Sequence, residues 1–89
     1  MIVEFDNSFL KSLSKIKDQP TLRRIKKIIL ELEDSKDLNK IRNIKKLTGY
    51  KNYYRIRIGD FRIGFEYLNE NTIRLIIIAH RKDIYRNFP

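Results

Sequence analysis

The sequence predicts an α+β domain in which an N-terminal strand and two amphipathic helices pack on an antiparallel sheet of four to five strands. Three observations predict it. Apolar residues recur at helical spacing over the first third of the chain. They alternate with polar residues at strand spacing over residues 53–67, and a nearly continuous apolar run at 72–79 is typical of a covered central strand. Because 89 residues provide one core, residues 1–89 are predicted to form a single domain.

The N-terminal third is expected to form a short strand followed by a helical hairpin. Residues 2–6 alternate apolar and acidic side chains, as a short strand does. Asp6 or Asn7 can cap the first helix, and Asp18 followed by Pro20 marks the start of the second. Each helix carries one apolar stripe, formed by Phe9, Leu10, Leu13 and Ile16 in the first and by Leu22, Ile25, Ile28, Ile29 and Leu32 in the second.

Residues 35–43 are expected to form a loop, and residues 44–48 a short strand. The next segment, YYRIRIGDFRIGFEY, is predicted to form a hairpin with a two-residue turn at Gly59-Asp60, in which glycine takes the first central position of a type II′ turn. This turn fixes the register, because a slip by one residue would move every apolar side chain to the other face. The apolar face that results is formed by Tyr54, Ile56, Ile58, Phe61, Ile63 and Phe65.

The opposite face of the hairpin carries arginines. The same register places Arg57 directly across from Arg62, and Arg55 across from Gly64. Like charges in facing positions destabilise a sheet, so a bound anion is expected to offset their repulsion. The planar guanidinium group suits bidentate hydrogen bonding to a phosphate. We therefore expect an open face with a phosphate site, in which Gly64 leaves a recess. The competing interpretation is a solvated polar face.

The tail, HRKDIYRNFP, follows a second turn at residues 69–71 and the apolar strand, and is expected to form a single helical turn. His80 follows the apolar strand, Arg81 lies beside it, and Tyr85 follows four residues later. Side chains alternate along a strand, so His80 and Arg81 reach one site only if the strand ends or twists between them. A lone histidine is also more often structural than catalytic.

Composition narrows the classes of function. The chain has no Cys and a single His, which argues against disulfides and zinc sites, so neither a metal nor a cofactor is expected. The N-terminus lacks the basic and apolar segments of a signal peptide, and no apolar run approaches the roughly 20 residues that span a bilayer. A soluble, cytoplasmic protein with no membrane contact is therefore expected. The net charge of +9 is typical of a protein that binds nucleic acid.

Two segments, YYRIRIGDFRIGFEY and IIIAHRKDIYRNF, resemble the RelE toxins of type II toxin–antitoxin systems, within the RelE/ParE superfamily. The resemblance extends over nearly the whole chain, and its specific motifs lie in the hairpin and the C-terminal part. It implies a RelE-like fold and a cytoplasmic ribonuclease that enters the ribosomal A site. Such an enzyme cuts mRNA without a metal, by attack of a 2′-hydroxyl on the adjacent phosphate, and so inhibits translation.

The resemblance also implies site residues. The catalytic set carried over from the family is Arg57, Arg62, Arg81, Tyr85 and His80, and the expected RNA-binding set is Arg55, Arg57, Arg62, Lys51, Lys82 and Arg86. In the best-known RelE pattern the two basic positions of the first hairpin strand are lysines, one of which is thought to act as general base. Arginine stays protonated, so Arg57 is a poor base. Tyr85 or His80 must then carry more of the proton transfer, or the ribosome and the substrate must contribute.

The implied partners are the ribosome, mRNA and a RelB-like antitoxin with an acidic, amphipathic segment. The toxin–antitoxin complex is expected to bind operator DNA through the antitoxin. Two other functions stay open. One is inhibition of DNA gyrase, as by ParE toxins, which share the fold but lack this set of basic residues. The other is a basic RNA-binding module without catalysis, for which the convergence of Arg62, Arg81 and Tyr85 would be unnecessary.

Overall fold

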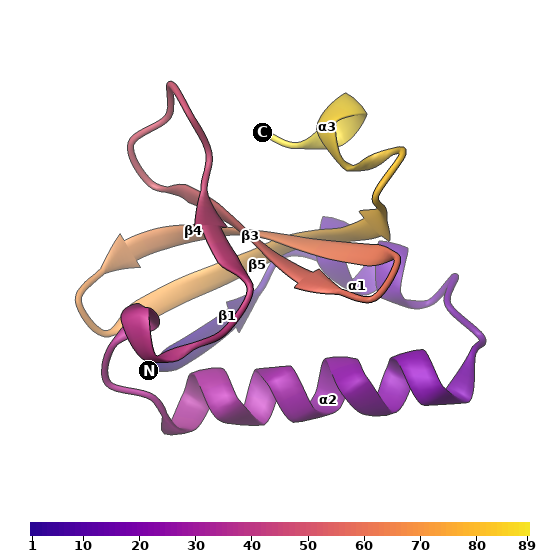
Figure 1. Cartoon of the computed structure of the whole chain (residues 1–89), viewed down its shortest axis with the longest axis horizontal. Helices are drawn as coiled ribbons and strands as arrows, with labels where there is room; N and C mark the ends of the chain where they lie inside the picture. Colours follow the sequence, from indigo (N-terminus) through magenta and orange to yellow (C-terminus); the bar gives the residue numbers. More distant parts are fainter.

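The computed structural model describes residues 1–89 as a twisted five-stranded sheet with helices on both faces (Figure 1). The strand order is β1-β5-β4-β3-β2. The elements in chain order are β1 (Ile2–Phe5), α1 (Asn7–Leu13), α2 (Gln19–Asp34), the 3-10 helix η1 (Leu38–Lys40), β2 (Ile44–Lys46), β3 (Tyr53–Ile58), β4 (Phe61–Asn69), β5 (Thr72–His80) and α3 (Ile84–Asn87). The predicted α+β class is confirmed.

The sheet is mixed, whereas the sequence predicted a purely antiparallel one. Strands β2 to β5 are antiparallel neighbours, but β1 runs parallel to β5, with Ile2 across from Thr72. A parallel pair needs a long crossover between its strands, and the helical hairpin together with the other strands supplies one. The alternating pattern of residues 2–6 predicts a strand, but nothing in it selects the partner or the direction.

Both helices begin where the sequence predicts. Asp6 caps α1, where its carboxylate accepts a hydrogen bond from the backbone N–H of Ser8 at 3.1 Å. Asp18 caps α2 by accepting from the N–H of Thr21, also at 3.1 Å. Proline occupies the first turn of α2, where its missing N–H removes no helical hydrogen bond. None of the helices combines the length and the apolar content that a membrane-spanning helix requires.

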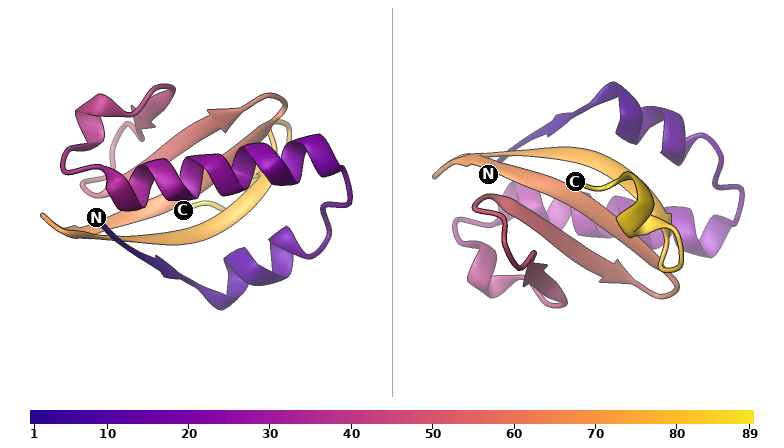
Figure 2. Two further views of the ribbon diagram at one scale, coloured as in Figure 1. Left: turned by 90° about the horizontal axis from the view of Figure 1, so that it is seen from below. Right: turned by 90° about the horizontal axis from the view of Figure 1, so that it is seen from above.

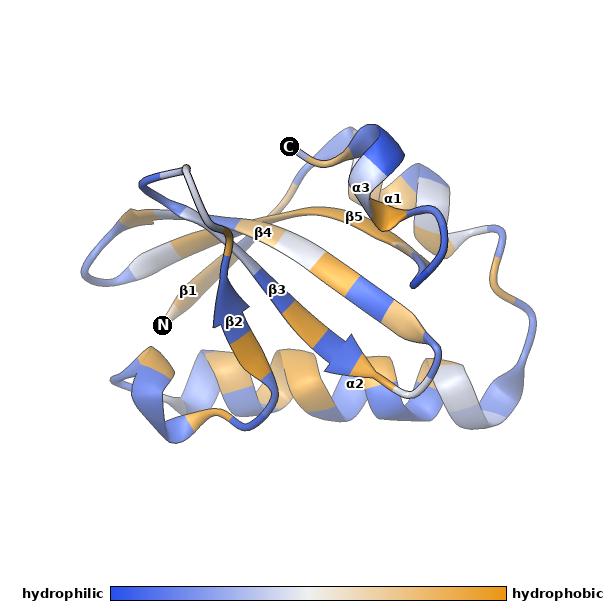
Figure 3. Ribbon diagram, turned by 45° about the horizontal axis from the view of Figure 1, so that its top comes forward, coloured by the Kyte–Doolittle hydropathy of each residue, from blue (hydrophilic) through white to orange (hydrophobic).

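The main core lies between the sheet and the two N-terminal helices, α1 and α2. Apolar and polar residues alternate along β3 and β4, so that one face of the hairpin is apolar (Figure 3). This face packs against α1 and α2, and α2 lies on the opposite side of the sheet from α3 (Figure 2). The buried cluster consists of Phe9, Ile25, Leu32, Ile56, Ile58, Ile63, Phe65, Ile73, Leu75 and Ile78.

Helix α1 protects the part of β5 that β1 does not reach. The pairing of β1 ends at Phe5 with Leu75, which leaves the second half of β5 without a strand neighbour on that side. The Ser8 hydroxyl donates to the Ile76 carbonyl, and the Ile78 N–H donates to the Ser12 hydroxyl at 3.0 Å. Two serines of α1 therefore satisfy strand groups that would otherwise lack a partner.

Replacing Asp18 with Ala should lower the free energy of unfolding at neutral pH, because the cap of α2 is lost. The hydrogen bonds from the Thr21 hydroxyl and N–H lower the pKa of Asp18 below its ordinary value of 3.8. A carboxyl whose pKa is lowered by folding stabilises the folded state above 3.8 and loses this contribution as the pH falls through the folded-state pKa.

Urea unfolding at several pH values should thus show a gap between wild type and Asp18→Ala that closes on acidification. Asp18→Asn should keep a large part of the cap throughout, because asparagine is also a preferred cap and has no charge to lose. A gap of constant size down to pH values well below 3.8 would contradict this role of Asp18.

Candidate active site

The turn between β3 and β4 brings two arginines face to face. Gly59 has a φ of +57°, whereas Asp60 has no positive φ, which is the pattern of a type II′ turn. Arg57 and Arg62 are direct partners across the two strands, as the sequence predicts. The N–H of Arg57 donates to the carbonyl of Asn43 at 3.1 Å and not to β4. The pair is therefore of the non-hydrogen-bonded kind, in which facing side chains come closer together.

Hydrogen bonds to the turn hold the Arg62 guanidinium in place. Its Nη1 donates to the carbonyl of Gly59 at 2.8 Å and to that of Phe61 at 2.9 Å. An arginine has five N–H donors, so three of them remain available to an anion. Arg62 is half-buried, so part of the residue remains exposed to solvent.

Three further arginines lie close enough to Arg62 to affect its pKa, and we refer to Arg55, Arg57, Arg62 and Arg81 as the arginine cluster. Partial burial, followed by the positive charges of the other three arginines, lowers the pKa of Arg62. An arginine pKa is so high that Arg62 keeps its charge at any ordinary pH. Neither of the salt bridges in the structure involves the cluster. The cluster is therefore a concentration of positive charge that no carboxylate of the chain neutralises.

Arg81 joins the cluster because it directly follows β5, whose last residue pairs with the first residue of β4 beside the turn. The N–H of Arg81 donates to the carbonyl of Asp60 at 2.8 Å. His80, one residue earlier, pairs with Phe61, and the centroids of their rings are 5.9 Å apart. The Phe61 side chain packs against the main core, on the face of α1 and α2. The structure thus brings Arg81, but not His80, to the arginine cluster.

The face that carries the arginines is partly covered, whereas the sequence predicted an open one. Ile84 is fully buried and Phe88 is 2% exposed, although both lie outside the main core. A Cβ atom at Gly64 would lie 2.6 Å from the Phe88 ring, so the expected recess at Gly64 is filled by this ring. Tyr53 packs edge-on against the same ring, with centroids 5.5 Å apart. Sequence reasoning missed Phe88, although a glycine inside a strand often marks such a close approach.

Burial of Phe88 anchors α3, and α3 carries Tyr85. The Tyr85 side chain is 58% exposed and lines a hollow of about 380 Å³ together with Arg55, Lys45 and Lys46. Tyr85 also lies close enough to Arg62 to affect the pKa of that arginine, in the opposite direction from the neighbouring arginines. A phenolic hydroxyl is therefore available at the edge of the arginine cluster.

The remaining predicted RNA-binding residues lie farther along the surface. Lys51 is exposed in the loop before β3, at the opposite end of that strand from Arg57. Lys82 is exposed, and its backbone N–H donates to Nδ1 of His80 at 3.2 Å. Arg86 is exposed and forms a salt bridge with Asp83 at 3.7 Å, so part of its charge is already compensated. No three carboxylate or imidazole side chains come together as a metal site would require.

A family model described as the ParE toxin of the type II toxin–antitoxin system parDE matches residues 3–85. The chain belongs to the RelE/ParE toxin family. Among its relatives, Toxin RelE3 of Methanocaldococcus jannaschii is 46% identical over 90 residues, an alignment that covers all of both chains. Putative toxin RelE1 of the same organism is 34% identical over 78 residues, which cover 84% of this chain and 87% of the relative.

Solved structures agree with this assignment. The RelB–RelE antitoxin–toxin complex from Methanococcus jannaschii contains a chain that is 44% identical and superimposes with a TM-score of 0.81, over 97% of this chain and 99% of that one. A chain of the Escherichia coli RelBE complex has the same fold at 22% identity, with a TM-score of 0.69 over 89% of this chain and 94% of that one. The chain is thus a RelE-type toxin of a type II toxin–antitoxin system.

The contact between Gly64 and Phe88 predicts a coupled pair of substitutions. Gly64→Ala should destabilise the protein by about 1–3 kcal/mol, because the new methyl group overlaps the Phe88 ring. In a Phe88→Ala background the same change should cost little, since the ring is gone. Thermal unfolding of the four proteins of this double-mutant cycle measures the coupling.

A matched control is Gly49→Ala, where a Cβ would meet no atom within 4 Å and only the positive φ opposes the substitution. Its cost should be the same with and without Phe88. Equal costs of Gly64→Ala in the two backgrounds would show that Phe88 does not occupy the space above Gly64.

Proposed function

We propose that this RelE-type toxin is a metal-independent endoribonuclease that cleaves mRNA on the ribosome in the cytoplasm, and so inhibits translation. In the reaction the 2′-hydroxyl oxygen forms a bond to the adjacent phosphorus while the bond from phosphorus to the 5′-oxygen breaks. The 2′-hydroxyl gives up its proton to a base, and the departing 5′-oxygen gains one. The products are a 2′,3′-cyclic phosphate and a free 5′-hydroxyl.

The arginine cluster is the observation that carries this proposal. Negative charge grows on the phosphate oxygens in the transition state, and fixed cations placed beforehand stabilise it most effectively. Arg62 meets this requirement, because the turn carbonyls hold its guanidinium and leave three donors free. Arg57 adds a second charge from directly across the hairpin. A pure binding module would have no need to gather such charges around one tight turn.

The acid–base part of the proposed site is weaker than its electrostatic part. The arginines stay protonated and cannot accept the 2′-hydroxyl proton. The location of His80 beside Phe61, on the helix face, favours Tyr85 as the side chain that takes part in proton transfer. A phenol is a poor base near neutral pH, so the ribosome or the substrate must assist. Free RNA should accordingly be cut slowly, and chelators should have no effect on ribosomal cleavage.

Arg62→Ala should lower the single-turnover rate of mRNA cleavage on ribosomes by on the order of 10²-fold or more, because a fixed charge donor is lost. Binding to the ribosome should weaken far less, since many other cations contribute. The melting temperature should stay near that of wild type or rise, because the loss of two hydrogen bonds is offset by relief of the repulsion with Arg57.

The control for Arg62→Ala is Arg23→Ala, which removes the same charge from an exposed position on α2. Tyr85→Phe separates the roles further, since a large loss of rate with unchanged affinity would assign the hydroxyl to the chemistry. If Arg62→Ala cleaves as fast as wild type, or melts well below it, the arginine pair is structural and the proposal fails.

Inhibition of DNA gyrase is the second candidate function, because the matching family model is described as a ParE toxin. The full-length match to Toxin RelE3 and the arginine cluster both favour the ribonuclease. Incubation of the purified protein with gyrase and plasmid, beside a toeprinting assay on translated mRNA, separates the two. Gyrase-dependent DNA breaks without cuts in mRNA would replace the proposal with the ParE activity.

We further propose a RelB-like antitoxin as the cognate partner, through which the complex binds operator DNA. The related toxin from Methanococcus jannaschii was solved in a complex with RelB, and this chain carries a net charge of +9. The contacting segment of the antitoxin should therefore be acidic on one side and apolar on the other, docked as a helix in a groove or as an added strand.

Charge attraction of this kind predicts that association slows as the salt concentration rises past about 0.15 M. Stopped-flow mixing of the toxin with its antitoxin at increasing salt measures the association rate constant, and the dissociation rate constant should change less. A basic antitoxin whose association is insensitive to salt would contradict the proposal.

A further inference from the structure

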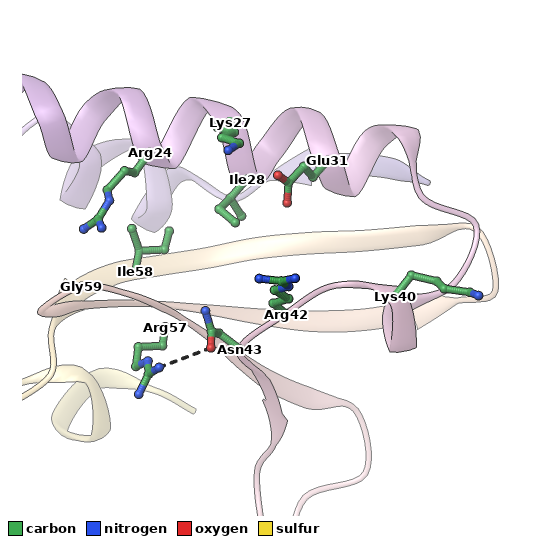
Figure 4. A pocket seen from close by; sticks show the side chains of 10 residues that line it. All are labelled: Arg24, Lys27, Ile28, Glu31, Lys40, Arg42, Asn43, Arg57, Ile58 and Gly59. Carbon is green, nitrogen blue, oxygen red and sulfur yellow. Dashed lines mark hydrogen bonds between the residues drawn. The ribbon is translucent and has the colours of Figure 1, made fainter.

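A second basic cavity lies between α2 and the tip of the β3–β4 hairpin (Figure 4). Its volume is about 490 Å³, and we refer to it as the α2 groove. Its charged lining consists of five cations and one anion, namely Arg24, Lys27, Lys40, Arg42, Arg57 and Glu31. Neither of the salt bridges in the structure involves any of them. Unneutralised like charges in a concave surface repel one another and attract anions.

The Arg24 side chain forms one wall of this groove, and the segment around Asn43 forms the other. Arg24 descends from α2 toward the hairpin turn, where a Cβ at Gly59 would lie 2.9 Å from its Nη1. On the other side, Asn43 has a φ of +65°, a left-handed conformation that asparagine tolerates better than most residues. Its carbonyl accepts from the Arg57 N–H at 3.1 Å and its side-chain oxygen from Arg57 Nη2 at 3.4 Å. This bend fixes the segment that carries Arg42 against β3.

The groove is continuous with the arginine cluster at the edge of the sheet. Strand β2 pairs with β3 only as far as Ile44 with Ile56, so the last residues of β3 have no strand neighbour on that side. Arg57 sits at this edge and belongs to both the groove and the cluster. An RNA strand whose phosphates reach the cluster can therefore continue around the edge of β3 into the groove and stay beside basic side chains along the whole path.

We propose that the α2 groove is a second binding site for RNA phosphates, in which Arg24, Lys27 and Arg42 hold the sugar–phosphate backbone. The inference rests on the proposed function, since it assumes that the arginine cluster binds RNA. The bound phosphates belong either to the mRNA strand whose reacting phosphate lies on the cluster or to ribosomal RNA beside it. Both sources present the same chemistry to the groove.

The test compares two double variants of one helix. Arg24→Gln with Lys27→Gln removes two charges from the groove. Arg23→Gln with Lys26→Gln removes the same residue types from the preceding positions, which are exposed and do not line it. All four residues are exposed, so both variants should melt within a few degrees of wild type, and the comparison uses only variants that do.

Two binding assays distinguish the sources of phosphate. The first titrates the free protein with a single-stranded 2′-O-methyl RNA oligonucleotide, which cannot be cleaved, and the second titrates ribosomes without mRNA. If the groove holds the mRNA strand, the groove variant should bind the oligonucleotide about tenfold more weakly. Its plot of log affinity against log salt should also lose about 0.7 in slope for each phosphate contact removed. If the groove holds ribosomal RNA, the loss should occur on ribosomes alone.

A larger loss for the groove variant than for the control, in either assay, supports the α2 groove as a phosphate site. Equal losses for the two variants in both assays would overturn it, because the groove would then act only through net charge. Neither assay depends on catalysis. A protein that fails to cleave mRNA but still shows the groove-specific loss would refute the proposed activity and leave the phosphate site in place.

Discussion

Burial of the apolar face of the β3–β4 hairpin is the constraint on which the rest of the structure depends. Ile56, Ile63 and Phe65 are fully buried on this face. Each contributes about 1.5–3 kcal/mol by burial, whereas a facing pair of like charges in a sheet costs roughly 0.2–1 kcal/mol. A slip of one residue would separate Arg57 from Arg62 but would expose these three side chains. The core therefore decides the register, and the arginines are forced together on the other face.

This ordering of energies explains which features could be predicted from the sequence. The register of the hairpin depends on a two-residue turn and on alternation, both of which are local, and the prediction that Arg57 faces Arg62 is confirmed. Helix starts depend on the residue at the cap and were found at Asp6 and Asp18 for the same reason. Contacts between residues far apart in the sequence could not be predicted from such local patterns. The parallel pairing of β1 and the placement of Phe88 over Gly64 depend on surfaces that exist only after folding.

The predicted site residues also divide into those placed by local geometry and those placed by contacts distant in the sequence. Arg57 and Arg62 come together through local geometry, and Arg81 joins them through one backbone hydrogen bond to the turn. The register of β5 shifts by one residue between Leu75 and Ile77, and this irregularity moves Ile78 and His80 to the helix face, where His80 pairs with Phe61. Tyr85 reaches the edge of the cluster because Ile84 of α3 and Phe88, which directly follows α3, are buried. The sequence predicted Tyr85 as a site residue through family resemblance, whereas the contacts that position its helix are visible only in the structure.

Stability and charge consequently lie on opposite faces of the same two strands. The apolar face toward α1 and α2 supplies the main core. The opposite face can therefore carry arginine side chains that form no salt bridge within the chain. Repulsion within the cluster is released when a phosphate binds, and this release adds to the affinity for any polyanion that fits. In the proposed ribonuclease, this fixed cluster would interact most strongly with the transition state, because that species carries the most localised negative charge. Under the proposed function, the arginines supply the electrostatic part of catalysis, and the proton transfer depends on the ribosome or the substrate.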